Sequence, residues 1–186
     1  EGEKIPQEEK IYSIFERHTE WIAKDKSRPN VELGHRLLVT TDQHGLIHDY
    51  KIMNGGSEPA EIPLLIERLK IKFSTKEGVN IASLSTDKGF SSRENMEMLE
   101  TLVDQVIMPK KGKLTPAEKQ KQSAKSWRKL AHAHSAIESD INCLEHHGLD
   151  RCPDKGFKNY ERYVSLGVLS YNLHKIGNHL QGKVRV

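Results

Sequence analysis

Cysteine is nearly absent from this sequence, which has only Cys143 and Cys152 among its 186 residues. Two cysteines make no disulfide framework, so a disulfide-stabilised secreted domain is excluded and a reducing, cytoplasmic location is expected. Long apolar runs are absent too, since none approaches the roughly 20 residues that span a bilayer. A membrane-spanning protein is therefore excluded, and no membrane partner is expected.

The first residues lack both an initiator Met and the apolar core of a signal peptide. The sequence begins EGEKIPQEEK, which is polar and acidic. We expect residues 1–9 to be a lead-in that continues from a longer protein.

Charge of one sign does not dominate the whole chain, because the formal net charge is only +3. Lysine is instead concentrated in Lys110–Lys129, where Glu118 is the single acidic residue. Clustered positive charge is typical of a surface that binds phosphates, although a solvated loop and helix give the same pattern. With 30% charged and 35% hydrophobic residues, the chain is expected to form one soluble, globular domain.

Apolar periodicity predicts alternating strands and helices after an initial group of strands. We expect strands at residues 11–16, 35–42, 46–53, 80–87 and 105–110, and helices at residues 57–73, 91–104, 124–147 and 157–180. The second and third strands should form a hairpin, and residues 18–34 a loop. Ile62, Leu65, Ile66, Leu69 and Phe73 should form the buried stripe of the first helix. This order indicates an α/β fold with a mixed sheet flanked by helices.

Three carboxylates occupy positions that suit metal-dependent cleavage of a phosphodiester. Glu16 ends the first expected strand, Asp87 ends the fourth, and Glu138 lies beside the apolar stripe of a late helix. Carboxylates can hold two hard cations roughly 3.5–4 Å apart, one activating the nucleophile and the other stabilising the leaving oxygen. Each residue taken alone could equally be an exposed helix, turn or strand residue.

Several segments with unusual residues at fixed spacing resemble one family. They are SIFERHTEWIAKDK, ELGHR, STDKGF, MPKKGKL and HSAIESDINCLEHHGLDRCP. Over residues 10–180 the chain is similar to bacterial insertion-sequence transposases of the DDE type, in an ISNCY-like group. The resemblance implies a ribonuclease H-like core, a mixed β-sheet flanked by helices, in residues 10–181, with residues 182–186 as a tail. It also implies that Asp87 is the second acid, Glu138 the third, and Mg²⁺ or Mn²⁺ the cofactor.

The first acid departs from the family pattern, which has Asp at the end of the first core strand. Glu16 stands at the aligned position, and Asp42 and Asp49 are alternatives. The late helix differs as well. His134 stands where these enzymes usually carry Arg, and Glu145 where they carry Lys.

The resemblance implies an enzyme that cuts insertion-sequence ends and joins them to target DNA. The DNA contacts are expected from Lys88, Lys110, Lys111, Lys113, Arg128 and His134. The resemblance also allows a homodimer in the transposition complex and a cytoplasmic location near the bacterial nucleoid. Two alternatives stay open: a catalytically decayed transposase that only binds DNA, and a structure-specific nuclease on the same fold.

Overall fold

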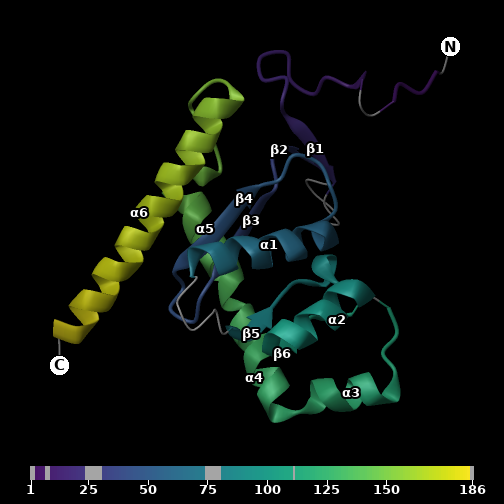
Figure 1. The fold of residues 1–186 in the computed structure, drawn as a ribbon. Helices are drawn as coiled ribbons and strands as arrows, with labels where there is room; N and C mark the ends of the chain where they lie inside the picture. Colours follow the sequence, from purple (N-terminus) through teal and green to yellow (C-terminus); the bar gives the residue numbers. More distant parts are fainter. Residues whose placement is uncertain (1–2, 7–8, 24–30, 74–80, 111, 185–186) are drawn as a thin grey trace. The chain divides into compact units, whose positions relative to one another are not determined.

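A computed structural model describes residues 3–6, 9–23, 31–73, 81–110 and 112–184 (Figure 1). The chain divides into two compact units. The first comprises Glu1–Thr40, Tyr50–Gly55 and Asn142–Val186, and the second comprises Thr41–Asp49 and Gly56–Ile141.

In the first unit, β1 (Glu20–Ala23) and β2 (Val31–Gly34) pair antiparallel, with Trp21 opposite Leu33. The long helix α6 (Phe157–Val184) follows a π-helical turn, Glu145–Leu149. Gly148 has a φ of 102° in this turn, and its carbonyl accepts a hydrogen bond from the Tyr163 hydroxyl at 2.9 Å. Glycine tolerates such a left-handed conformation, which interrupts the helical path inside this turn.

The predicted hairpin is confirmed as β3 (Leu37–Thr41) and β4 (Ile47–Ile52), which pair with each other. Asp42 closes the turn: its Oδ1 accepts the backbone N–H groups of His44 and Leu46 at 2.8 and 2.9 Å. Gly45 supplies the positive φ of 73° that this turn needs.

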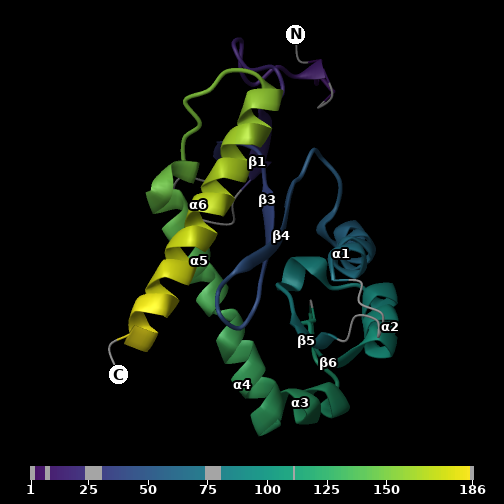
Figure 2. The same ribbon diagram turned by 60° about the vertical axis from the view of Figure 1, so that its left-hand side comes forward.

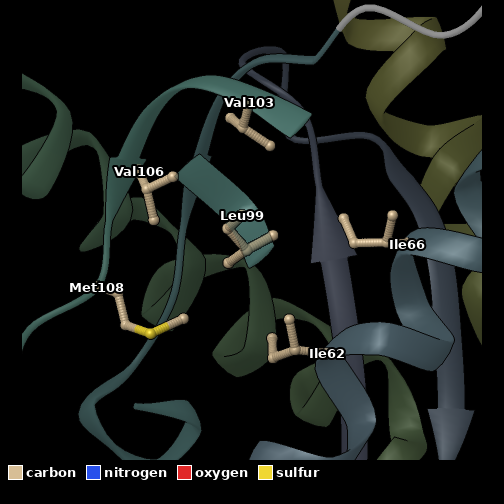
Figure 3. Packing of buried hydrophobic residues seen from close by; sticks show 6 residues of the cluster. All are labelled: Ile62, Ile66, Leu99, Val103, Val106 and Met108. Atoms are coloured by element: carbon tan, nitrogen blue, oxygen red, sulfur yellow. The ribbon is translucent and has the colours of Figure 1, made fainter. Parts of the chain in front are cut away.

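The core of the second unit lies between α1 (Glu58–Lys72), α2 (Arg93–Leu102) and the parallel strands β5 (Ile81–Ser85) and β6 (Val103–Ile107). Parallel strands need a crossover, and α2 provides it, lying alongside β6 (Figure 2). The predicted stripe of α1 is buried except for Phe73, which caps the helix and is 41% exposed. The buried cluster consists of Ile62, Ile66, Leu99, Val103, Val106 and Met108 (Figure 3).

The predicted strand at residues 11–16 is wrong. Residues 13–19 turn instead, because Ser13 Oγ accepts the Glu16 N–H at 3.0 Å and Glu16 O accepts the Thr19 N–H. Ile14 and Phe15, a β-branched and an aromatic residue that suggested a strand, are 85% and 88% exposed. β-Propensity reflects packing on a sheet face, which this segment lacks. The expected loop at residues 18–34 contains β1 and β2 instead, and its residues 24–30 lie outside the described residues.

The predicted single helix at residues 124–147 is also wrong. The lysine-rich segment forms α3 (Pro116–Ser123), and α4 (Lys125–His134) and α5 (Ala136–Leu144) follow. Ser135 separates the last two, and its hydroxyl donates to the His132 carbonyl at 2.6 Å. Such a bond from serine to the preceding turn competes with the helical ladder and bends helices.

The architecture is α/β, as predicted, with more strands than expected. The described strands pair two by two as β1–β2, β3–β4 and β5–β6. The ribonuclease H-like arrangement of a single mixed sheet stays a prediction.

Candidate active site

Asp87 lies two residues beyond the end of β5, in the second unit. It precedes the 3₁₀ turn Lys88–Phe90 but makes no side-chain cap bond to it, so its carboxylate is available for other partners. That side chain is 73% exposed, and its Oδ1 lies 3.0 Å from Nε2 of His134. The hydrogen bond from His134 lowers the pKa of Asp87, against an opposing effect of partial burial. Asp87 is therefore an ionised, accessible carboxylate at neutral pH.

His134 and Glu138 lie on successive helices of the same unit. His134 is the last residue of α4, and its side chain is only 18% exposed. Glu138 lies in the first turn of α5 and is exposed, and its N–H is bonded to the Ser135 carbonyl. Four residues separate the two, as the sequence suggested, and His134 is the one that contacts Asp87.

Glu16 belongs to the first unit, where its carboxylate is fixed by two donors. Its Oε2 accepts the Gly156 N–H at 3.0 Å and lies 2.9 Å from Nε2 of His18. Two hydrogen bonds hold the Glu16 side chain in one orientation. A metal ligand that is already oriented loses less conformational entropy when the metal binds. Glu16 lies in a turn, not at the strand end that the sequence suggested.

A histidine pair behind Glu16 was missed by the sequence reasoning. Nδ1 of His18 lies 2.9 Å from Nε2 of His35, and Phe157 packs edge-on against both rings, with centroids 5.2 Å away. Burial lowers the pKa of His35, opposed by the Glu20 carboxylate and helped by His18. His18 Nε2 donates to the Glu16 carboxylate, so His18 links Glu16 to His35. Both histidines occur in the family-like segments, ERH and GHR, and this was the available signal.

The alternative first acids have structural partners. Burial raises the pKa of Asp42, but hydrogen bonds from His48, Leu46 and His44 outweigh it and leave the pKa below its ordinary value. Asp49 is 1% exposed, and it forms ion pairs with Arg68 at 2.8 Å and with Lys72. Both carboxylates are thus used within the second unit, to close the hairpin turn and to hold α1.

The expected DNA-contacting cations differ in their surroundings. Lys88, Lys113 and Arg128 are exposed, whereas Lys110 forms an ion pair with Glu118 at 2.9 Å. Glu118 also closes a capping box with Thr115 at the start of α3. The Thr115 N–H and the Lys110 ammonium lower the pKa of Glu118 to about 2. Lys111 lies outside the described residues.

The chemistry of these acids suits a hard divalent cation, because carboxylate oxygens are the ligands that Mg²⁺ and Mn²⁺ prefer. Within the described parts of the chain, no three His, Cys, Asp or Glu side chains come together as a metal-binding group. Two of the three proposed acids are each bonded to a histidine of their own unit: Asp87 to His134, and Glu16 to His18.

The sequence matches the family model of the transposase DDE domain over residues 9–173. This match covers most of the chain, so the protein belongs to the DDE transposase family. No curated protein and no solved structure matches the sequence. Across the described residues, every helix is too short or too polar to cross a membrane.

Proposed function

We propose that this chain is the catalytic domain of a DNA transposase that performs divalent-metal-dependent phosphodiester cleavage and strand transfer at insertion-sequence ends. Membership of the DDE transposase family supports the transposase function. One observation carries the catalytic part: Asp87 is an ionised, exposed carboxylate after β5, held by His134 one helical turn before Glu138.

In this proposal Glu16, Asp87 and Glu138 hold Mg²⁺ or Mn²⁺. A metal held by these residues would supply an activated water and would stabilise charge on the leaving oxygen. The water oxygen bonds to phosphorus, the bond to the 3′-oxygen of the neighbouring nucleotide breaks, and that oxygen takes up a proton. The freed 3′-hydroxyl loses its proton and bonds to a target phosphorus, while the bond from that phosphorus to the target's 3′-oxygen breaks and this oxygen takes up a proton.

Neighbouring protein groups orient two of the acids. His134 donates to Asp87, and His18 and the Gly156 N–H hold Glu16. Such partners of a ligating carboxylate fix its geometry and hence the affinity for the metal. Lys88, Lys110, Lys111, Lys113 and Arg128 contact the DNA backbone, where lysine and arginine position the duplex without reading its sequence.

The proposal includes the finer points that the family match leaves open. They are the ISNCY-like group, the ribonuclease H-like arrangement, DNA ends and target DNA as partners, and a cytoplasmic, nucleoid-associated location. The proposal also includes a second copy of the chain in the transposition complex.

The test is a cleavage assay with the full-length protein, DNA carrying the element's own ends, and Mn²⁺. Glu16→Gln, Asp87→Asn and Glu138→Gln should each abolish nicking, because each keeps the side-chain shape and removes the charge. Glu97→Gln is the matched control, since Glu97 is exposed and pairs with Arg93 on its own helix. Cleavage at the wild-type rate by Asp87→Asn rules out its role, and an inactive wild-type protein that still binds DNA indicates a decayed transposase.

A further inference from the structure

The turn that follows Asp87 is tied to its surroundings by the buried side chain of Asn95. Asn95 lies in the first turn of α2 and is 5% exposed. Its side-chain amide donates to the carbonyl of Phe90 at 3.1 Å and to the carbonyl of Pro59 at 2.8 Å. Phe90 ends the 3₁₀ turn after Asp87, and Pro59 lies in the first turn of α1. One amide group thus connects the turn to the starts of two helices of the second unit.

The orientation of the Asn95 amide follows from its partners. Both acceptors are carbonyl oxygens, so only the NH₂ end of the side chain can face them, and its two hydrogens match the two acceptors. The backbone of Asn95 is held as well, because its N–H donates to Ser92 Oγ at 3.0 Å in the cap of α2. Without the amide, two partly buried carbonyl oxygens would lose their donor, which would destabilise their present positions.

A second contact joins the same turn to α1. A Cβ on Gly89 would overlap the carboxylate of Glu58, the first residue of α1. The glycine therefore lets this carboxylate lie directly against the turn. Helix α1 holds the turn through Glu58 and Pro59, and α2 holds it through Asn95.

Two backbone hydrogen bonds carry this restraint to Asp87 and Lys88. The Phe90 N–H donates to the Asp87 carbonyl, and the Ser91 N–H donates to the Lys88 carbonyl, each at 3.2 Å. Since the Asp87 side chain makes no cap bond to the turn, its direction follows from this backbone and from the bond to His134. A displaced turn would move the Asp87 carboxylate relative to His134.

We propose that Asn95 is a positioning residue for Asp87: its amide holds the Lys88–Phe90 turn where the Asp87 carboxylate meets His134 and can bind a divalent cation. This inference rests on the proposed function, in which Asp87 is a metal ligand. A ligand on a fixed backbone binds a metal more tightly than one that must first be ordered, and loss of such support typically lowers metal affinity by about 10–100-fold.

Two measurements on the full-length protein without DNA test the proposal. Amide hydrogen exchange in the absence of metal reports on the turn, and Asn95→Ala should speed exchange of the Phe90 and Ser91 amides at least tenfold. The electron paramagnetic resonance signal of free Mn²⁺ reports on metal binding. The part of Mn²⁺ binding that Asp87→Asn removes should be weakened by about 10–100-fold in Asn95→Ala.

Leu69→Ala is the matched control. Leu69 is a buried residue of the same unit, and it lies ten residues beyond Pro59 on α1, or about 15 Å along the helix. Its removal leaves a cavity and destabilises the unit, as a structural change elsewhere would. Exchange at the turn and Mn²⁺ binding should both stay at their wild-type values in the folded Leu69→Ala protein.

Circular dichroism checks that each variant is folded. If Asn95→Ala is not, Asn95→Ser replaces it, with the same direction of change, because one hydroxyl hydrogen can serve at most one of the two carbonyls. Unchanged exchange at the turn, or equal changes in Leu69→Ala, would overturn the proposal. Faster exchange with unchanged Mn²⁺ binding would overturn it too, since the amide would then support only the fold. A wild-type protein without Asp87-dependent Mn²⁺ binding would contradict the proposed function instead, and hydrogen exchange alone would then decide whether Asn95 holds the turn.

Discussion

Nε2 of His134 lies 3.0 Å from Oδ1 of Asp87, although 47 positions separate them in the sequence. The bond joins the end of α4 to the segment after β5 and helps to keep Asp87 ionised. A carboxylate oriented in this way is prepared to bind a cation.

His134→Ala should therefore lower Mn²⁺-dependent DNA cleavage by about 10–100-fold, the usual effect of removing a residue that orients a metal ligand. His134→Arg should retain more activity, since arginine also donates to a carboxylate. His132→Ala is the control, because His132 is an exposed histidine on the same helix. Equal activity of the His134→Ala and wild-type proteins in a single-turnover assay would contradict this role.

Loss of charge at Asp49 and at Asp87 should have opposite effects on the free energy of unfolding. Asp49→Ala removes a buried carboxylate that pairs with Arg68 and Lys72, and should lower the free energy of unfolding by about 1.5–3 kcal/mol. Asp87→Asn should leave it equal or slightly higher, because Asp87 is exposed and caps no helix through its side chain. Urea denaturation measures both values. Marked destabilisation by Asp87→Asn would indicate a structural aspartate.

The exposed lysines should contribute to DNA affinity in a salt-dependent way. Lys113→Ala is expected to reduce the slope of log K against log salt by about 0.9, the value for one phosphate contact on duplex DNA. Lys110→Ala should have a similar effect only if DNA displaces Glu118 from Lys110. Lys70→Ala, on the exposed side of α1, is the control. An unchanged slope for the Lys113 and Lys110 variants would indicate a solvated loop.

Glu118 should titrate far below an ordinary glutamate. Its folded-state pKa is lowered from 4.5 to about 2. The stability that its carboxylate gives to the start of α3 is therefore fully present above pH 4.5 and is lost as the pH falls through about 2. NMR titration of the Glu118 carboxyl carbon should show this low midpoint. Thr115→Ala removes the hydroxyl of the capping box and should raise the midpoint. A wild-type midpoint near 4.5 would contradict the capping geometry.

Periodic patterns predicted the fold where one face of an element is buried. The stripe of α1 and the β3–β4 hairpin follow from spacing and turn residues, and the structure has both. Ile14 and Phe15 misled the prediction because β-propensity does not reveal whether a sheet is there to receive them. The break at Ser135 depends on one side-chain bond, which helical periodicity does not encode.

The sequence proposes residues for the candidate site, but it does not predict their contacts. Helical spacing placed His134 one turn before Glu138, but the contact with Asp87 is long-range and requires the fold. The His18–His35 pair joins a turn to the start of the hairpin, and no sequence period links such segments. The sequence does not show whether Asp49 faces solvent or the interior, and its burial depends on how β4 packs in the fold.

The most direct measurement of the central claim is anomalous scattering from crystals of the full-length protein soaked with Mn²⁺. We predict a Mn²⁺ peak within coordination distance of Asp87 and Glu138, with Glu16 completing the site, and loss of that peak in Asp87→Asn crystals. A Mn²⁺ peak elsewhere in a well-ordered structure, with Glu138 turned away from Asp87, would contradict the assignment of these three carboxylates as the metal site.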